Sequence, residues 1–542
     1  ATGTAAEAPK ATPRPPVVRT PDATPTTDTS ATKPTDAPVN VPKPTRSTSA
    51  VTTIPTTTDT TTDTTTDTTT DTTTDTAPTR TVPDQPAPVQ AAPVQPTPIT
   101  PTPITPTPTP TSRPTPTRPT QAAPTTPTTP PPAARTPAPS TPAVRAPTTQ
   151  LRGLWVDAFG PGMKTPEQVD QLVADASRLR VNVLFAQVVK RGDCYCEVDA
   201  LPRTADPDVP GGFDPLADLI EKAHAANIQV HAWIVPLAVV NVPDLPAPPQ
   251  PDHVFNTHGP DATGEDAWLM RRQNGETLSG NDYYLDPGHP AVADHVVEEI
   301  AEIARKYAVD GIQLDRMRYP DPSGGGQDWG YNETAVARYQ AETGTTGVPA
   351  PSDVRWTTWR RDRVTDLVRR VRDAVKAERP AAWVSVATIT YGPGPRDLAA
   401  FRQTRTYAEV LQDWPSWLRT GAVDLIVTMN YKRDATQGAW FDGWNRFALS
   451  VRGAGRVAAG TALYLNSVEA SVGQARRSVA AGLDGWVGYS YRTPDDRAEA
   501  NPTGAPGTRA DLFDRLTAPD GPLTGTPVWG TPGGNERATS SR

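Results

Sequence analysis

The sequence predicts an α/β fold, a (β/α)8 TIM barrel preceded by a long disordered segment rich in proline and threonine. Three observations support this prediction. Short apolar runs alternate eight times with amphipathic segments after residue 150, as expected of buried parallel strands and their covering helices. Residues 1–150 contain no Trp, Tyr, Phe or Cys. The run over residues 309–320 (VDGIQLDRMRYP) ends a buried strand in the carboxylate of Asp315, and such barrels carry their chemistry at the strand ends.

Residues 1–150 are expected to form a disordered stalk. Pro, Thr and Ala dominate this segment, which therefore cannot bury enough apolar surface to offset the entropy of ordering. A Thr-Thr-Thr-Asp repeat over Asp59–Asp75 gives way to Pro-Thr alternation over residues 96–120, a composition that favours extended polyproline II structure. We expect an inert tether, with a specific ligand-binding tail as the alternative.

The folded part, residues 151–517, contains eight strand candidates. They are Leu151–Asp157, Val181–Val189, Gln229–Val235, Asp310–Asp315, Trp383–Ile389, Asp424–Tyr431, Val457–Tyr464 and Gly485–Tyr491. Helices are expected between and after them, over residues 165–179, 214–226, 290–307, 353–378, 403–419, 438–452, 467–481 and 508–516. Thr165 and Asp214 each stand as a capping residue before a proline that opens a helix. Residues 518–542 are rich in Gly, Pro and Ser, and we expect a flexible tail there.

Alternation along the fourth strand decides which residues face the barrel interior. Gly311, Gln313 and Asp315 share one face, because successive side chains point to opposite sides. Long segments follow the third strand (residues 241–287) and the fourth (residues 323–332), and in a barrel they would lie on the active face. The alternative fold, an open doubly wound sheet, would be expected to show a Gly-rich phosphate loop after its first strand, and the sequence has none.

Composition limits the partners. The net charge of −8 and the pI of 5.4 argue against nucleic acid or an anionic membrane as the main partner. No apolar run approaches the roughly 20 residues of a transmembrane segment. The chain begins at Ala1 rather than Met, which fits an exported protein whose signal peptide has been removed, or a chain trimmed at its start. We expect a secreted or bacterial cell-envelope location.

Cysteine and histidine usage predicts no metal and no cofactor. Cys194 and Cys196 are the only cysteines, and no neighbouring His or Cys cluster completes a zinc site. Their C-x-C spacing disfavours an intrachain disulfide. We therefore expect two thiols.

Eight stretches together resemble the glycosyl-hydrolase-like 10 family of bacterial envelope or secreted TIM-barrel proteins. In chain order they are LRGLWVDAF, QVVKRGDCYCE, FDPLADLIEKAHAANIQVHAWIVP, YYLDPGHPAVADHVVEEI, DGIQLDRMRYP, WGYNETAVARYQ, WRRDRVTDLVRRV and DLIVTMNYKR. The resemblance covers nearly all of residues 151–490 and implies a glycoside hydrolase of bacterial cell-wall or extracellular polysaccharide, including peptidoglycan-type glycan. The chain departs from the family pattern at Gln313, Arg316 and Cys196.

Glycoside hydrolysis usually requires two carboxyl groups, one to protonate the leaving oxygen and one to attack the sugar or activate water. Asp315 is the first candidate, because its strand points it into the barrel mouth. Its alternative role is a structural carboxylate paired with Arg318. Asp157 ends the first strand on the face of Trp155 and is the preferred partner, although it could equally orient an arginine at the rim. No Glu ends a predicted strand.

Polar and aromatic residues near the strand ends are candidates for substrate binding. Aromatic rings with polar tips stack on sugar faces and bond to hydroxyls, and cations bind carboxylates. The candidates are Gln187, Arg191, His231, Trp233, Arg318, Tyr319, Asn430, Tyr431, Tyr464 and Tyr489. The alternatives are barrel filling for His231 and Trp233, a solvated loop for Arg191, and core packing for any single tyrosine. At the level of the whole chain, the alternatives are a non-catalytic glycan-binding envelope protein and a structural envelope spacer.

Overall fold

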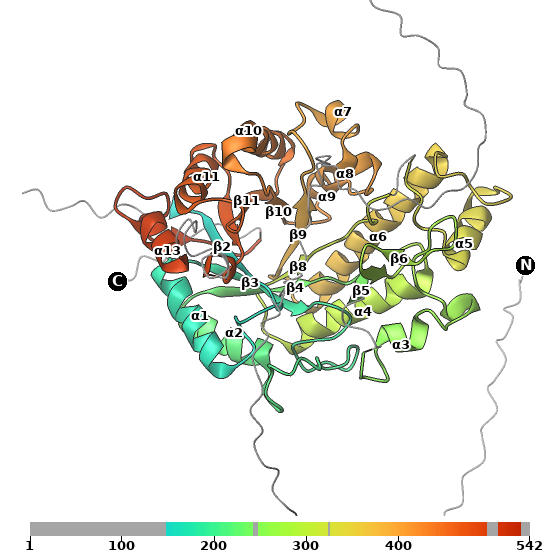
Figure 1. Ribbon diagram of the computed structural model, residues 1–542, viewed down its shortest axis with the longest axis horizontal. Coiled ribbons are helices and arrows are strands. Elements are labelled where there is room, and N and C mark those ends of the chain that lie inside the picture. Colours follow the sequence, from blue (N-terminus) through green and yellow to red (C-terminus); the bar gives the residue numbers. More distant parts are fainter. Residues whose placement is uncertain (1–147, 242–247, 323–325, 496–507, 533–542) are drawn as a thin grey trace, which may run out of the picture. The chain divides into compact units, whose positions relative to one another are not determined.

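The computed structural model describes residues 148–241, 248–322, 326–495 and 508–532 (Figure 1). Eight strands form a closed barrel in which every neighbouring pair is parallel. In chain order they are β2 (Leu151–Val156), β3 (Val183–Val189), β4 (Gln229–Ile234), β8 (Gly311–Leu314), β9 (Trp383–Ile389), β10 (Leu425–Met429), β11 (Arg456–Ala462) and β12 (Gly485–Tyr489). The predicted (β/α)8 barrel is confirmed. All but the last three residues of the predicted stalk lie outside the described residues.

Helices surround the barrel (Figure 1). The main ones are α1 (Pro166–Arg178), α2 (Pro215–Ala225), α4 (Pro290–Lys306), α6 (Val354–Glu378), α10 (Asp434–Val451), α11 (Val468–Ala480) and α13 (Arg509–Thr517). The predicted caps are present: the Thr165 side chain accepts from Gln168 N, and Asp214 accepts from Ala217 N. Within the described ranges, none of the helices combines the length and apolar composition needed to cross a bilayer.

The single helix expected over residues 403–419 is wrong. The chain instead forms three short helices, α7 (Leu398–Phe401), α8 (Arg405–Ala408) and α9 (Trp414–Arg419). Leu411 adopts a φ of +57°, a left-handed conformation that interrupts a helix. The interruption brings residues 410–412 to the barrel end, where Gln412 Oε1 accepts from Ile389 N at 2.8 Å.

The barrel interior is filled by aliphatic side chains together with large aromatic ones. Trp155, Phe185 and Trp233 belong to one buried apolar cluster, whereas Ile312 and Leu314 pack in the outer layer against the helices. The predicted facing of the fourth strand is therefore confirmed. Small residues make room for these rings. A Cβ on Gly460 would lie 2.4 Å from the Trp155 ring, closer than packed atoms approach.

The long segment after the third barrel strand forms a small antiparallel sheet. It consists of β5 (Ala238–Asn241), β6 (Leu278–Ser279) and β7 (Asp282–Tyr284), in the order β5-β7-β6. Short helical segments lie in the two long loops: α3 (Val254–His258), the 3-10 helix Gly264–Asp266, and α5 (Glu333–Thr343).

The flexible tail expected from residue 518 is wrong for residues 518–532, which pack against the barrel. β13 (Pro527–Val528) pairs in parallel with β1 (Thr148–Thr149). The buried guanidinium of Arg152 donates to the carbonyl oxygens of Leu523, Thr524 and Gly525. Burying a cation is costly unless it is hydrogen-bonded, so Arg152 holds this segment in place. Residues 533–542 lie outside the described part.

Candidate active site

Asp315 directly follows β8 at the barrel mouth, by which we mean the end of the barrel where its strands terminate. Its side chain is nearly buried, with the residue 8% exposed. Oδ2 accepts from Trp233 Nε1 at 3.1 Å, and Oδ1 accepts from Arg316 N at 2.7 Å. Burial raises the pKa of the Asp315 carboxyl, although the charges of Arg316 and Arg318 oppose this shift. A carboxyl with a raised pKa is suited to donate a proton.

Three tyrosines from the later strand ends gather beside this carboxyl. The ring centres of Tyr431 and Tyr489 lie 5.3 Å apart, and Tyr464 lies 6.4 and 6.1 Å from them. Tyr489 is also 6.2 Å from Trp233, the residue that donates to Asp315. All three tyrosines are partly exposed. The structure therefore brings together four of the predicted substrate-binding residues and Asp315.

Tyr431 lies within the electrostatic reach of both predicted carboxylates. Burial raises its pKa well above the usual range, and the nearby Tyr489 and Tyr464 add to the shift, as do Asp315 and Asp157. Its ring also packs edge-on against Trp155, whose centre is 6.2 Å away. Trp155 Nε1 in turn donates to the Gln313 side chain. Gln313, where the family resemblance implied a different residue, thus anchors the aromatic floor of the mouth.

Asp157 is fully engaged by the protein. Its side chain is 0% exposed. Oδ1 pairs with Arg492 Nε at 2.7 Å and accepts from Phe159 N at 3.2 Å, and Oδ2 accepts from Ser490 Oγ at 2.6 Å. These contacts tie the end of the first barrel strand to the segment after the last. They give Asp157 the alternative role stated above, a carboxylate that orients an arginine at the rim.

A second buried ionic group reaches the mouth from the small antiparallel sheet. Asp282 of β7 accepts from Arg316 Nη1 at 2.7 Å and pairs with Arg191 Nη2 at 3.3 Å. Tyr284 Oη lies 3.0 Å from the same Arg316 nitrogen. Arg316 has a φ of +51°, a strained conformation for a non-glycine residue. This network holds the residue that follows Asp315, and with it the Arg316 N–H that contacts the carboxylate.

Asp321, which sequence reasoning passed over, is the most accessible of these acids. Its side chain is 43% exposed. It accepts from Tyr391 Oη at 3.1 Å and pairs with Arg405 at 3.0 Å. Arg318 Nη1 lies 3.6 Å from Asp321, and the Arg318 charge also acts on Asp315. The signal in the sequence was its place, directly after Pro320 in the loop that begins at Asp315.

Four predicted binding residues lie in the interior instead of at the surface of the mouth. Gln187, His231, Tyr319 and Asn430 are all at most 1% exposed. Gln187 Oε1 accepts from Ala158 N at 3.0 Å, and Asn430 Nδ2 donates to Phe441 O at 2.9 Å. Burial lowers the pKa of His231 to about 3, so its ring is neutral. Gln187 and Asn430 thus hold neighbouring backbone groups in place, and all four side chains are covered by protein atoms.

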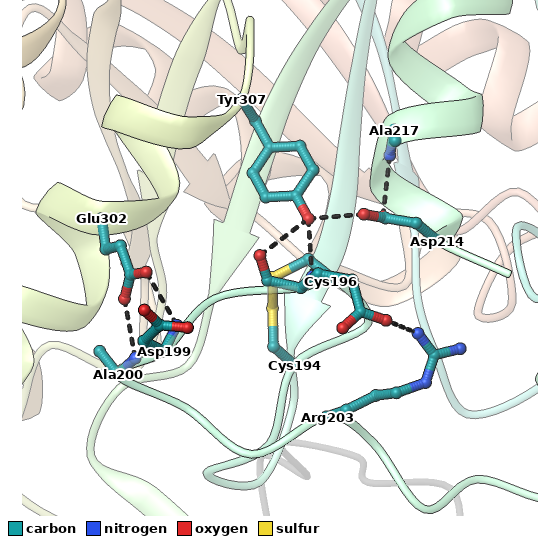
Figure 2. The surroundings of a disulfide bond; sticks show 10 residues. Cys194, Cys196, Asp199, Ala200, Arg203, Asp214, Ala217, Glu302 and Tyr307 are labelled. Carbon is teal, nitrogen blue, oxygen red and sulfur yellow. Dashed lines mark hydrogen bonds and ion pairs between the residues drawn. A yellow bond between two sulfur atoms is a disulfide. The ribbon is translucent and has the colours of Figure 1, made fainter. Parts of the chain in front are cut away.

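The expectation of two thiols is wrong, because Cys194 and Cys196 form a disulfide (Figure 2). Their Cα atoms are 5.0 Å apart, within the usual range for a disulfide. The turn around them is fixed by other contacts. The Tyr307 hydroxyl accepts from Glu197 N at 2.6 Å and donates to Asp214 at 2.6 Å, and Glu302 accepts from Asp199 N and Ala200 N. These contacts let a C-x-C pair close.

Among the described residues, no three His, Cys, Asp or Glu side chains lie close enough together to hold a metal ion.

Comparison with known proteins places this barrel in a family. The family model described as "Glycosyl hydrolase-like 10" matches residues 150–448, more than half of the chain. The chain belongs to the glycosyl hydrolase-like 10 family. This match spans the first six barrel strands and the residues Asp157, Trp233, Asp315 and Asp321.

The relatives that match this chain in sequence have names that state only a general class, glycosyl hydrolase. The chain is 26% identical over 321 residues to "Glycosyl hydrolase YngK" of Bacillus subtilis (strain 168), covering 56% of this chain and 56% of that protein. It is 26% identical over 273 residues to "Glycosyl hydrolase DigH" of Escherichia coli (strain K12), covering 49% and 58%. The chain thus spans little more than half the length of these relatives.

Among solved structures, the glycoside hydrolase domain of PgaB (BpsB) from Bordetella bronchiseptica superimposes with a TM-score of 0.47 at 17% identity. The superposition covers 69% of this chain and 99% of that one.

Proposed function

We propose that this chain is a glycoside hydrolase that cleaves bacterial cell-wall or extracellular polysaccharide, with Asp315 as the group that protonates the leaving oxygen. One observation carries the proposal: the Asp315 carboxyl is buried at a strand end, has a raised pKa and is oriented by Trp233 Nε1 and Arg316 N. A general acid must hold its proton near the working pH. Membership of the glycosyl hydrolase-like 10 family supports the same reaction class.

The second carboxyl group of the proposed reaction is Asp321. Its side chain is 43% exposed, so a sugar or a water molecule can reach it beside its arginine and tyrosine partners, whereas the side chain of Asp157 is 0% exposed. The Arg318 guanidinium lies 3.6 Å from Asp321, and its positive charge also acts on Asp315, so a single cation interacts with both carboxyls. Asp157 then acts as a positioning residue through Arg492 and Ser490.

The three tyrosines supply the proposed binding surface for sugar rings. Tyr431, Tyr464 and Tyr489 present partly exposed rings beside Asp315. Rings of this kind stack on pyranose faces while their hydroxyls bond to the sugar. Carbohydrate is therefore the substrate class that this surface favours.

An exported location fits the cysteine chemistry. Disulfides persist in oxidising compartments and are rare in the cytosol. The Cys194–Cys196 disulfide therefore supports a secreted or cell-envelope location.

A second candidate is a glycan-binding protein without hydrolysis. The pairing of the acids at the mouth with arginines favours it, because a paired carboxylate is less available for catalysis. Asp157, Asp282 and Asp321 all pair with arginines. One experiment separates the two candidates. Purified sacculi, denuded glycan strands and a panel of neutral and acidic polysaccharides are incubated with the wild type, with Asp315→Asn and with the control Asp366→Asn, which alters an exposed carboxylate on α6.

We expect products from the wild type and the control, and a loss of at least about 100-fold in Asp315→Asn, the smaller end of the range for general acid catalysis. Equal product release by all three would remove Asp315 from the reaction. Binding without product release in all three proteins, the wild type included, would favour the second candidate.

A further inference from the structure

A groove lies at the end of the barrel opposite Asp315, where the strands begin. It has a volume of about 580 Å³, within the size range of small-molecule sites. Its lining includes Trp383, the first residue of β9, and Arg456, the first residue of β11. Trp529, from the packed C-terminal segment, forms another part of it. This end of a barrel ordinarily serves stability alone, so a lined groove here needs an explanation.

An aromatic pair forms one wall of the groove. The rings of Trp383 and Trp529 stack with centres 5.0 Å apart and planes inclined by 21°. Trp383 Nε1 donates to Gly530 O at 2.9 Å. Trp529 Nε1 is buried, yet it has no acceptor among the described residues. A buried indole N–H normally has a partner, so Trp529 is an unusual residue in the groove lining.

Cationic side chains form another part of the groove lining. Arg372, Arg419 and Arg456 line the groove with a single acid, Asp424. That acid is already engaged, since it pairs with Lys376 at 2.8 Å and accepts from Val384 N at 2.9 Å. The lining therefore has an excess of positive charge, in a chain whose net charge is −8.

Two of these arginines, Arg372 and Arg419, have N–H groups that meet no acceptor among the described residues. Arg372 Nε is buried and has no acceptor in the part of the chain that is described. Its Nη1 contacts only the neighbouring Asp373, at 2.8 Å. Among those same residues, Arg419 forms no hydrogen bond or ion pair. Arg456, by contrast, shares Asp484 with Arg452. The unsatisfied groups are all donors, and two of the three belong to cations.

We propose that this groove is a second, non-catalytic binding site for an anionic glycan segment, one that carries carboxylate or phosphate groups. Guanidinium groups bind both anions with paired, charge-assisted hydrogen bonds, and the Trp383–Trp529 pair adds aromatic surface for the adjoining sugar. The requirement for an anion follows from the lining. The choice of a glycan over other anions rests on the proposed function. Such a site would hold one part of a polymer on the protein while another part of the same polymer is cleaved at the mouth.

The test measures binding by calorimetry in the Asp315→Asn background, so that no probe is consumed. The probes are an oligogalacturonate, a poly(glycerol phosphate) and a neutral cello-oligosaccharide. We compare the parent with Arg372→Gln/Arg419→Gln and with Arg396→Gln, an exposed arginine after β9 at the other end of the barrel. The melting temperature of each variant checks folding.

We expect the parent and Arg396→Gln to bind at least one anionic probe, more weakly at high salt. The double variant should bind it about tenfold more weakly, the effect of losing a charge-assisted hydrogen bond of about 1.4 kcal/mol or more. Comparing the oligogalacturonate with the poly(glycerol phosphate) shows whether the groove recognises carboxylate or phosphate groups. Failure of the parent to bind either anionic probe, or equal binding by the folded double variant, would overturn the site.

Hydrolysis is measured separately, with the same groove substitutions in the chain that keeps Asp315. Cleavage of a short soluble substrate should be unchanged by them. A chain that hydrolyses glycans but binds neither anionic probe contradicts the groove alone. A chain that binds the anionic probes through the groove but hydrolyses nothing contradicts the proposed function alone.

Discussion

Trp233 Nε1 donates a 3.1 Å hydrogen bond to Asp315 Oδ2, joining two residues 82 positions apart in the chain. Their strands, β4 and β8, are neighbours in the barrel, with Trp233 paired to Gln313. The bond fixes the direction of a carboxyl that is otherwise nearly enclosed. It also opposes the effect of burial on the Asp315 pKa, because an N–H donor favours the ionised form.

Replacing Trp233 with phenylalanine should therefore shift the pH profile. Trp233→Phe keeps an aromatic ring but removes the donor, so the pKa of Asp315 should rise further. The alkaline limb of kcat against pH should move to higher pH, and kcat should fall about tenfold as the carboxyl loses its orientation. Steady-state rates across the pH range test this. An unmoved limb would show that Trp233 only fills space.

Asp157 and Asp321 should respond differently to the same substitution. Asp321→Asn should lower kcat strongly and leave the free energy of unfolding nearly unchanged, because the side chain is half-exposed. Asp157→Asn should lower the free energy of unfolding by about 3 kcal/mol, since a neutral amide replaces the buried carboxylate that pairs with Arg492 and accepts from Ser490. Urea unfolding and kcat, measured on both variants, decide between the two roles. The reverse pattern would make Asp157 the second carboxyl of the reaction.

Glu299 of α4 should make the protein less stable as pH rises. It is 2% exposed, Oε1 has no partner among the described residues, and burial raises its pKa well above the usual value. Its neighbour His295, 3.5 Å away, has a pKa lowered to about 4 by burial and is neutral at pH 7.

Between the unfolded pKa of Glu299, near 4.3, and its raised folded value, the folded state binds more protons, so the free energy of unfolding falls as pH increases. Glu299→Gln should abolish this slope and stabilise the protein at pH 7 by at least about 1 kcal/mol. Urea unfolding from pH 4 to 8 measures the effect. Parallel curves for wild type and variant would contradict it.

The disulfide should make a small contribution to stability. Titration of the unfolded, unreduced protein should find no free thiol, because Cys194 and Cys196 are bonded. Cys194→Ser/Cys196→Ser should lower the free energy of unfolding by only about 1–2 kcal/mol, as the closed loop is very short. Tyr307, Asp214 and Glu302 continue to hold the turn. A loss of folding in the double variant would show that these contacts do not suffice.

Local patterns predicted the features that depend on neighbours in the chain. Alternation over residues 311–315 placed Asp315 inside the barrel with Ile312 and Leu314 outside. Thr165 and Asp214 capped their helices as expected. These features follow from strand and helix geometry, which a few adjacent residues determine.

Long-range partners were not predictable in this way. The break at Leu411, the packing of Trp529 on Trp383 and the Cys194–Cys196 bond are each accompanied by contacts with residues farther along the chain, which local patterns do not encode. The same is true of Tyr319 and Asn430, which resemble rim residues along the chain but are covered in three dimensions.

By itself, the sequence determined the barrel, its eight strands and the strand end that carries Asp315, because periodicity and strand parity are local. Only the tertiary structure decided which acids a substrate can reach. The strand-end position of Asp157 favoured it along the chain, yet its side chain is enclosed by Arg492 and Ser490, whereas Asp321 is half-exposed. The availability of a carboxylate depends on what surrounds it, and that is settled only when strands from both ends of the chain close into one barrel.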